Sequence, residues 1–308
     1  MPREISLIFP GQGSQHLGML SEELTHSHID IINKSSDLLN FDIKSIINAD
    51  SDETLNKTSY TQPALLLTSY LYFLTFKKLS NIKPTLMAGH SLGEYSALVA
   101  ADAIDFYDAL KLVHRRGVLM EEAPNGLMAA IIGLDALVLH DICEEVSSQN
   151  NIVSCANLNS PMQTVIAGTD SAVSKVCDIA KEKGAKRSIK LNVSVASHCL
   201  LMQKPAEIFN EFLEQISIAK PSINVIQNYS GEISEDELTI KSNLIQQLTG
   251  SVKWSHTMSK LKESNSLVIE CGPGKVLSGI AKSNEINDIL FMSSTNFKSQ
   301  FEELVWTI

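Results

Sequence analysis

The hydrophobic and polar positions alternate between short apolar runs and longer stretches with helical spacing, a pattern typical of an α/β protein. Residues 5–9 and 267–270 are short apolar runs that end at glycine-rich turns, and both predict buried strands. Residues 85–88 form another such run, followed by a tight turn and by helix-forming residues at 94–101. These segments predict strand–turn–helix units of an α/β domain.

Two longer helical patterns lie in the first half of the chain. The apolar segment 60–76 predicts a buried helix with Pro63 at its first position, where the missing N–H of proline costs nothing. A second helix at 105–120 has an inward stripe at three- and four-residue spacings, formed by Ala109, Leu112, Val113, Gly117 and Met120. Near the C-terminal end, we expect a strand at 223–227 and a helix at 242–248.

Residues 126–195 follow a different order, which predicts a small separate domain. The pattern gives a strand at 128–134, a helix at 135–148, strands at 152–156 and 164–167, a helix at 170–182 and a strand at 188–195. This β-α-β-β-α-β order is that of a ferredoxin-like unit. We therefore expect a ferredoxin-like small domain at 126–195, inserted into a larger, discontinuous α/β domain of residues 1–125 and 196–308.

Composition and charge narrow the class of protein. The 308 residues are 44% hydrophobic and 19% charged, which excludes a disordered chain. The formal charge of −10 argues against a nucleic-acid-binding protein, because neutralising phosphates needs an excess of Lys and Arg. The apolar segments are too short for a membrane span or a signal peptide. Five widely spaced cysteines suggest neither a disulfide framework nor a zinc site, so we expect a cytoplasmic protein.

A candidate nucleophile lies in the turn after the strand at 85–88. Residues 89–93 read Gly-His-Ser-Leu-Gly, a G-x-S-x-G nucleophile elbow, with the strand before it and the helix after it that this motif requires. The glycines permit a sharp turn that exposes the Ser91 hydroxyl at a helix N-terminus, where the N–H of Leu92 would stabilise an oxyanion. A chance glycine turn is the alternative, and the matching context favours the nucleophile.

A serine nucleophile needs a general base, and three histidines are candidates. His198 follows the last strand of the small domain, a strand end of the kind that contributes catalytic groups in α/β proteins. His256 and His90 are its competitors. Spacing alone does not decide between His198 and His256.

The glycine-rich loop after the first strand holds a candidate for a second oxyanion donor. Residues 9–15 read Phe-Pro-Gly-Gln-Gly-Ser-Gln, but His16 occupies the third glycine position of a dinucleotide-binding G-x-G-x-x-G loop, so that motif fails. A backbone N–H near Gln12, at the carboxyl end of the strand, is placed to bind an oxyanion instead. An ordinary strand-terminating turn explains the segment equally well.

The helix at 105–120 carries two consecutive arginines that point in different directions. Arg116 lies with Leu112 and Met120 on the inward stripe, whereas Arg115 continues the polar side with Lys111. Full burial of an arginine is rare without an anion, and a guanidinium binds a carboxylate in a bidentate manner. Arg116 therefore predicts a site for an acidic group, and the alternative is an edge arginine whose charge reaches water.

At these residues the sequence closely resembles the malonyl-CoA:acyl-carrier-protein transacylases of type II fatty acid synthesis. The matching segments follow the family order along nearly the whole chain, at residues 9–15, 61–65, 89–95, 116–117, 128–134, 159–161, 197–198, 247–248 and 272–275. They include Gly-His-Ser-Leu-Gly-Glu-Tyr at 89–95, Asn-Ser-Pro at 159–161 and Gly-Pro-Gly-Lys at 272–275. The resemblance implies an α/β-hydrolase-like large domain that contains the ferredoxin-like insertion.

The resemblance also implies an activity and a role for the main candidates. Ser91 matches the family nucleophile, His198 matches its base, and Arg116 matches the ligand of the malonyl carboxylate. The implied reaction is ping-pong: Ser91 takes the malonyl group from malonyl-CoA and passes it to the pantetheine thiol of acyl carrier protein. No metal or redox cofactor is implied.

Further positions are assigned by the resemblance in the same way. The backbone N–H groups of Gln12 and Leu92 match the oxyanion hole. Asn159 and Gln247 match positions of the substrate site, where the backbone carbonyl that matches Gln247 orients the histidine. A thioesterase or carboxylesterase, a trans-acting acyltransferase of a polyketide pathway, and a noncatalytic carrier-binding protein are the alternatives that the sequence leaves open.

A basic run near the end of the small domain is a candidate docking surface. The resemblance implies an acidic carrier protein as partner, and because the chain itself carries −10, attraction needs a local basic patch. Residues 181–190 provide one, formed by Lys181, Lys183, Lys186, Arg187 and Lys190. The alternative is a solvated helix end without a partner.

Overall fold

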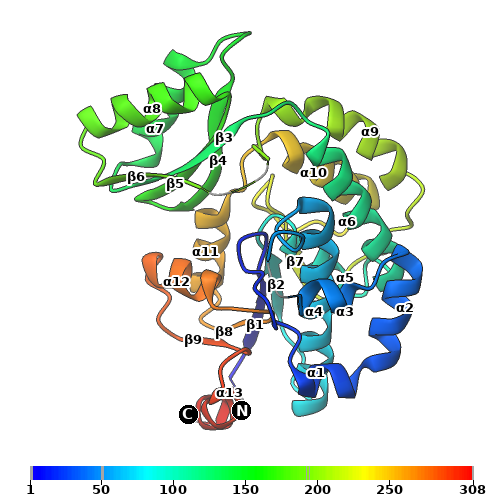
Figure 1. Ribbon diagram of the computed structural model, residues 1–308. Coiled ribbons are helices and arrows are strands. Elements are labelled where there is room, and N and C mark those ends of the chain that lie inside the picture. The colour runs from blue at the N-terminus through cyan, green and yellow to red at the C-terminus, as the bar shows by residue number, and fades with distance from the viewer. Residues whose placement is uncertain (1–2, 50–51, 192, 194, 307–308) are drawn as a thin grey trace.

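The computed structural model describes residues 3–49, 52–191, 193 and 195–306, and within them the chain forms two sheets (Figure 1). One is a parallel sheet with strand order β7-β2-β1-β8-β9. Its strands are β1 (Ile5–Phe9), β2 (Leu86–Gly89), β7 (Asn224–Ile226), β8 (Leu267–Glu270) and β9 (Ile289–Phe291). The α/β fold class expected from the sequence pattern is confirmed.

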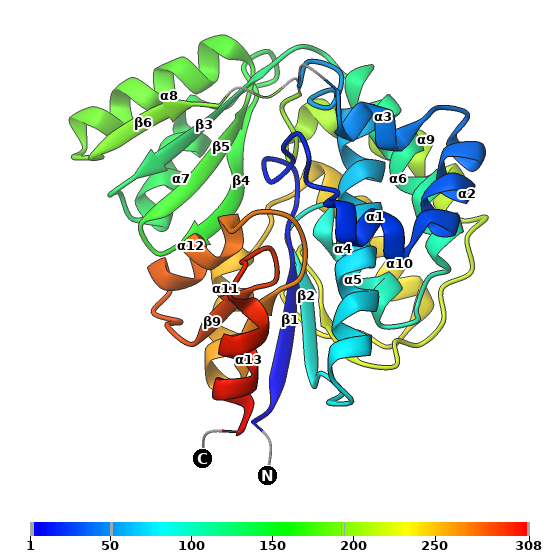
Figure 2. The same cartoon turned by 60° about the horizontal axis from the view of Figure 1, so that its bottom comes forward.

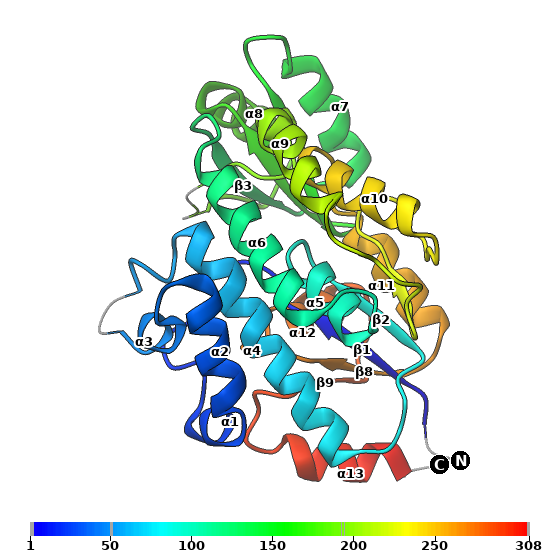
Figure 3. The same ribbon diagram turned by 90° about the vertical axis from the view of Figure 1, so that its right-hand side faces the viewer.

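Helices cover both faces of the parallel sheet, since its strands are apolar on both sides. Leu7 and Phe9 pack on one face with α4 (Thr58–Leu79), α5 (Gly93–Ala100) and α6 (Phe106–Glu121). Ile8 packs on the other face with α11 (Trp254–Glu263) and α12 (Val276–Ser283). Figure 3 shows α4 and α6 side by side on their face of the sheet.

The remaining helices pack around this core. They are α1 (Glu22–Ser27), α2 (Ile29–Leu39), α3 (Ile43–Ile47), α9 (Gln203–Leu213), α10 (Glu237–Thr249) and α13 (Phe297–Trp306), with a 3₁₀ turn at Leu200–Met202. Helix α13 lies beside the start of β1, where the Arg3 N–H donates to the Val305 carbonyl oxygen (Figure 2). Among the described residues, no helix combines the length and the apolar composition needed to cross a membrane.

The second sheet is antiparallel, with strand order β4-β5-β3-β6. Its strands are β3 (Leu127–Ile132), β4 (Val153–Ser160), β5 (Gln163–Gly168) and β6 (Arg187–Lys190), and its helices are α7 (Ala136–Val146) and α8 (Asp170–Glu182). Along β3, Ala129 and Ile131 face the two helices, while Met128 and Ala130 face the opposite side. The chain therefore follows the β-α-β-β-α-β order expected from the pattern.

The antiparallel sheet lies beyond the carboxyl ends of the parallel strands (Figure 2). In the parallel sheet, Phe9 at the end of β1 pairs with Gly89, and Ile8 pairs with Glu270, so these strand ends lie side by side. A bridge between Asn157 of β4 and Val252 joins the antiparallel sheet to the segment just before α11. The loops at the carboxyl ends of β1, β2 and β8 are thus placed between the two sheets, where α/β proteins bind ligands.

The predicted start of the long apolar helix is wrong. Helix α4 begins at Thr58, so Pro63 lies inside it and not at its first position. A proline in a helix interior leaves the carbonyl four residues earlier without its usual N–H donor. That carbonyl belongs to Ser59, and His114 Nδ1 on α6 lies 2.9 Å from it, which supplies the missing donor.

Other boundaries also differ. The strand expected at 188–195 ends at Lys190, and residues 192 and 194 lie outside the described residues. The helix expected at 242–248 is longer, because Asp236 caps it by accepting the Thr239 N–H and so starts α10 at Glu237.

Candidate active site

Ser91 lies in a sharp turn between β2 and α5. It adopts a left-handed backbone conformation, with φ +51°. A Cβ atom on Gly89 would lie 1.9 Å from the carbonyl group of Gly93, and one on Gly93 would lie 2.1 Å from the Phe9 carbonyl oxygen. Only glycine fits at either position, so the spacing of the G-x-S-x-G motif follows from the close approach of three backbone segments.

His198 is brought to Ser91. The Ser91 Oγ lies 2.8 Å from His198 Nε2, and His198 Nδ1 lies 2.6 Å from the backbone carbonyl oxygen of Gln247. Because a carbonyl only accepts, Nδ1 carries the proton and Nε2 is left to accept the serine proton. Burial, reinforced by the positive charge of Arg116, lowers the pKa of His198 to about 3, which keeps the imidazole neutral.

The two competing histidines have other contacts. His256 lies on α11 with its Nε2 3.3 Å from Glu232 Oε1, and its side chain is largely exposed. His90 is half-buried beside Ser91, where its Nε2 contacts Asn159 Oδ1 at 2.9 Å and its ring packs edge-on against Trp254. Burial lowers the pKa of His90, so it is held neutral as well. Of the histidines that spacing left open, His198 is the one in contact with Ser91.

A small cavity of about 80 Å³ lies in front of the Ser91–His198 pair. Residues from both sheets and from the segments between their elements line this cavity. They are Gln12, His90, Ser91, Leu92, Arg116, Met120, Met128, Asn157, Leu191, Val193, Val195, Ser197 and His198. Its size leaves room for about three water-sized groups, a scale that suits a short acyl chain. Gln12 and Leu92 both line this cavity, and in the described part of the chain neither backbone N–H donates to another residue.

Arg116 is almost fully buried, with 1% of its surface exposed, which confirms the inward orientation predicted from helix spacing. Its guanidinium donates to Gln62 Oε1 and to Gln247 Oε1, both at 3.0 Å. Both acceptors are neutral amides, and no carboxylate of the described residues lies within ion-pair distance. Burial lowers the pKa of Arg116, but arginine remains protonated in proteins. The cavity thus has a positive charge without a contacting anion.

The two remaining predicted substrate residues lie just outside the cavity lining. Asn159 accepts from His90 instead, and its neighbour Asn157 lines the cavity. Gln247 is fully buried behind the site, where its carbonyl holds His198 and its side chain contacts Arg116. Among the described residues, no group of three or more His, Cys, Asp or Glu side chains is placed to hold a metal ion.

Comparison with known proteins shows which proteins this chain resembles. Residues 6–282 match the acyl transferase domain family. A malonyl CoA-acyl carrier protein transacylase of Haemophilus influenzae is 44% identical over 287 residues, 91% of this chain and 92% of the relative. The solved structure of the malonyl CoA-acyl carrier protein transacylase from Coxiella burnetii superposes with a TM-score of 0.95 at 38% identity, over 100% of this chain and 99% of that one.

The chain belongs to the malonyl CoA-acyl carrier protein transacylase family. The family resemblance expected from the sequence is confirmed. A second solved structure describes a type II PKS acyl-carrier protein in complex with its malonyl-transacylase, which is 40% identical, with a TM-score of 0.91 over 98% of this chain and 99% of that one.

Sequence reasoning about this family member missed three polar residues around the site. Asn228 accepts the Ser91 N–H through its side chain at 2.6 Å. Gln62 contacts Arg116 from α4, and Glu94 contacts Gln247 from α5. Glu94 and Gln62 stand in the matching segments, whereas Asn228 follows a three-residue strand and has no sequence pattern around it.

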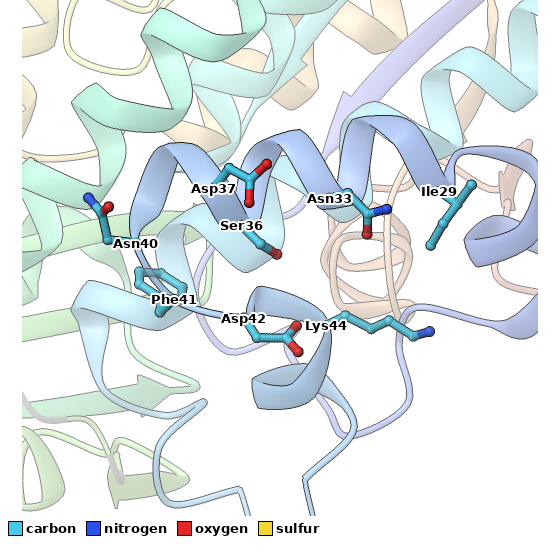
Figure 4. A pocket seen from close by; sticks show the side chains of 8 residues that line it. All are labelled: Ile29, Asn33, Ser36, Asp37, Asn40, Phe41, Asp42 and Lys44. Carbon is cyan, nitrogen blue, oxygen red and sulfur yellow. The ribbon is translucent and has the colours of Figure 1, made fainter.

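A larger hollow of about 700 Å³ lies on α2 and α3 and shares no residue with the cavity at Ser91. Figure 4 shows its lining, which is a set of mostly polar side chains around Asp37, Asp42 and Lys44. Asp42 caps α3 by accepting the Ser45 N–H at 3.0 Å, so its carboxylate has a structural role. The candidate active site is therefore chosen by the convergence of Ser91, His198 and Arg116 and not by the size of the hollow.

Proposed function

We propose that this protein transfers the malonyl group of malonyl-CoA to the pantetheine thiol of acyl carrier protein, through a malonyl ester on Ser91. The single observation that carries the proposal is the buried charge of Arg116 in the same small cavity as the Ser91–His198 pair. A serine nucleophile alone fits many acyl groups, but an unpaired guanidinium selects one with a distal carboxylate. The names of the relatives support the same substrate and partner.

The proposed reaction has two half-reactions that use the same groups. His198 Nε2 takes the proton of Ser91 as the oxygen attacks the thioester carbonyl, and the Gln12 and Leu92 N–H groups bind the oxyanion. The C–S bond then breaks, and the protonated His198 returns its proton to the CoA thiolate. In the second half, His198 takes the proton of the pantetheine thiol and the sulfur attacks the carbonyl carbon of the malonyl ester. The C–O bond to Ser91 then breaks, and the protonated His198 returns its proton to the Ser91 oxygen.

We infer that the carrier protein docks at the basic run of the small domain. Lys181, Lys183, Lys186, Arg187 and Lys190 are all exposed. They lie at the end of α8 and on β6, the edge strand of the antiparallel sheet. The chain after β6 contributes Leu191, Val193 and Val195 to the cavity lining, so the run leads directly to the active site.

The domain description is a further part of the proposal. The strand order β4-β5-β3-β6 with two helices on one face supports a ferredoxin-like insertion at 126–195. The parallel sheet with a nucleophile elbow after β2 supports an α/β-hydrolase-like domain of residues 1–125 and 196–308. In this arrangement the small domain closes one side of the cavity.

Two biological settings fit this chemistry. Fatty acid synthesis is the setting that the family resemblance implies. A polyketide pathway is the second candidate, because one of the similar solved structures pairs a malonyl-transacylase with a type II PKS acyl-carrier protein. A thioesterase would use the same elbow but has no need of Arg116, and a noncatalytic carrier-binding protein has no need of an intact Ser91–His198 pair.

Covalent acylation tests the proposal directly. After mixing with malonyl-CoA, intact-mass analysis of the wild type should show one malonyl adduct, and Ser91→Ala should show none. His198→Ala should lower the transfer rate by about 10²–10⁴-fold, the usual loss for a general base. His256→Ala is the matched control and should leave the rate unchanged. An adduct that persists on Ser91→Ala would exclude Ser91 as the nucleophile.

A further inference from the structure

A buried carboxylate lies behind the active site without lining its cavity. Glu94 stands in the first turn of α5 and is fully buried. Its Oε2 accepts two hydrogen bonds, one from the Asn228 N–H at 3.1 Å and one from Gln247 Nε2 at 2.6 Å. The mechanism proposed above gives Glu94 no task, although burying a carboxylate is costly.

The first contact sets the orientation of the Gln247 side chain. Gln247 Nε2 also lies 3.1 Å from the Ser91 carbonyl oxygen. Because a carboxylate and a carbonyl both accept, the amide nitrogen must face Glu94, and the amide oxygen must therefore face Arg116. That oxygen accepts from Arg116 at 3.0 Å, while the backbone carbonyl of the same residue holds His198.

The second contact sets the position of Asn228. The Asn228 side chain accepts the Ser91 N–H and donates to the Gly89 carbonyl oxygen, both at 2.6 Å. It therefore holds the two sides of the strained elbow together. Glu94 in turn holds the backbone of Asn228.

We propose that Glu94 is a positioning residue whose ionised carboxylate orients Gln247 and Asn228, and through them Arg116, His198 and the Ser91 turn. This role adds a residue to the site of the proposed malonyl transfer. It rests on the proposed function only in taking malonyl as the acyl group. Hydrogen bonds to an ionised acceptor are about twice as strong as those to a neutral one, so a neutral side chain at this position holds the network less firmly.

The ionisation of Glu94 lies in a range that an experiment can reach. Burial raises its pKa to about 7, against the lowering effect of the Asn228 and Gln247 hydrogen bonds and of Arg116. The titratable groups that face it are Arg116 from α6 and Tyr95 on its own helix, and burial raises the pKa of Tyr95 far above neutrality. Glu94 is therefore the group of this network that changes charge near neutral pH.

The test uses a probe that needs no malonyl group. A serine-reactive fluorophosphonate labels Ser91, and its rate is measured from pH 5.5 to 8.5 on the wild type, Glu94→Gln and Glu270→Gln. The wild-type rate should rise about tenfold through pH 7. Glu94→Gln, a neutral mimic, should stay at the low-pH rate throughout.

Glu270→Gln is the matched control. Glu270 is also fully buried and also accepts backbone N–H groups, but those of Leu277 and Ser278 at the start of α12. This variant should keep the pH-dependent rise. If the labelling rate of Glu94→Gln rises with pH as it does in the wild type, the proposal is overturned.

Two further readouts separate the possible failures. The ratio of kcat/KM for malonyl-CoA to that for acetyl-CoA should fall about tenfold in Glu94→Gln, because only the malonyl group has a carboxylate for Arg116 to bind. If the wild type shows the Glu94-dependent rise but transfers no malonyl group, the proposed function fails and the positioning role stands. If Glu94→Gln does not fold, the NMR chemical shift of the His198 Nδ1–H proton in the wild type is measured against pH. A change in this chemical shift near pH 7 supports the positioning role, and a constant chemical shift overturns it.

Discussion

Two residues of the active site hold backbone conformations that non-glycine residues rarely adopt. Ser91 has φ +51° and His198 has φ +63°, both in the left-handed region. Such strain persists where the surrounding structure holds it. The Ser91 N–H donates to the Asn228 side chain, and the His198 N–H donates to the Leu248 carbonyl at 3.0 Å. The strained backbone therefore aims the two side chains at each other.

Arg116 should decide which acyl group is transferred. Arg116→Ala leaves the malonyl carboxylate without a partner in a buried site, which costs on the order of 2–5 kcal/mol of transition-state stabilisation. Acetyl transfer should lose much less, because acetyl has no carboxylate. The measurement is kcat/KM with malonyl-CoA and acetyl-CoA. Arg115→Ala is the control, since its half-buried guanidinium packs over the Phe212 ring of α9 and Arg115 does not line the cavity. Equal losses for both acyl groups would show that Arg116 is structural.

Two buried titratable residues should affect stability in opposite directions as pH changes. Burial raises the pKa of Glu94 to about 7, so the folded state binds this proton more tightly than the unfolded state, and stability falls as pH rises toward 7. Burial lowers the pKa of His198 to about 3, so the unfolded state binds that proton more tightly, and stability falls as pH drops below 6.5.

Denaturant titrations between pH 5 and 6.5 test this pair. The unfolding free energy of the wild type minus that of Glu94→Gln should fall by about 1.4 kcal/mol per pH unit as pH rises. The unfolding free energy of the wild type minus that of His198→Gln should instead rise by a similar amount over the same pH range. If both free-energy differences change in the same direction with pH, the pKa shifts assigned to the buried Glu94 and His198 are contradicted.

At the scale of elements, the site depends on how closely α5 approaches the ends of β1 and β2. A Cβ on Gly93 would lie 2.1 Å from the Phe9 carbonyl oxygen, and the neighbouring backbone has no room to move because Phe9 pairs with Gly89. Helix α5 therefore starts directly against the sheet. Leu92 and Gln12 then line the same cavity.

Gly93→Ala should destabilise the protein by at least about 3 kcal/mol, because the added methyl group overlaps backbone atoms and not a flexible side chain. The matched control is Gly279→Ala in α12, where a Cβ meets nothing within 4 Å. That change should be neutral or stabilise by about 0.5–1 kcal/mol, since alanine is the better helix former. Thermal unfolding of both variants measures the difference, and similar melting temperatures would contradict the close packing.

At the scale of the whole molecule, residues of both sheets form the candidate active site. The parallel sheet contributes Ser91 and the loop with Gln12, and the antiparallel sheet contributes Met128 and Asn157. The chain that follows β6 leads to His198, which contacts Ser91 at the end of the parallel sheet. A partner that docks on the antiparallel sheet near β6 would therefore lie close to Ser91.

Charge reversal of the basic run tests this docking surface. Lys186→Glu together with Arg187→Glu should raise the KM for acyl carrier protein, because the run supplies local attraction on a chain of net charge −10. The effect should shrink at high salt, where exposed charges are screened within about 8 Å or less. Acylation by malonyl-CoA should hardly change.

Lys83→Glu with Lys298→Glu is the control, since it changes the net charge equally. Lys83 precedes β2 and Lys298 lies on α13, both exposed and near the amino ends of the parallel strands. If the Lys186→Glu and Arg187→Glu pair leaves the KM for acyl carrier protein unchanged at low salt, or if both pairs raise it equally, the basic run is not the docking surface.

The sequence by itself determined those helices and strands that form because of residues close together along the chain. The strands at 5–9 and 267–270 and the helix at 170–182 begin and end as predicted, because apolar runs and helical spacing are local properties. The inward direction of Arg116 also followed from helix spacing, and the elbow at Ser91 followed from its glycines.

Only the tertiary structure decided which distant groups meet. Spacing could not separate His198 from His256, because the contact with Ser91 joins residues 107 positions apart. The interior position of Pro63 depends on His114, a donor from another helix. Asn228 and Gln247 reach the site through side-chain contacts across 137 and 156 positions, which no local pattern records. Burial sets the pKa values of Glu94 and His198, and burial is a property of the packed molecule alone.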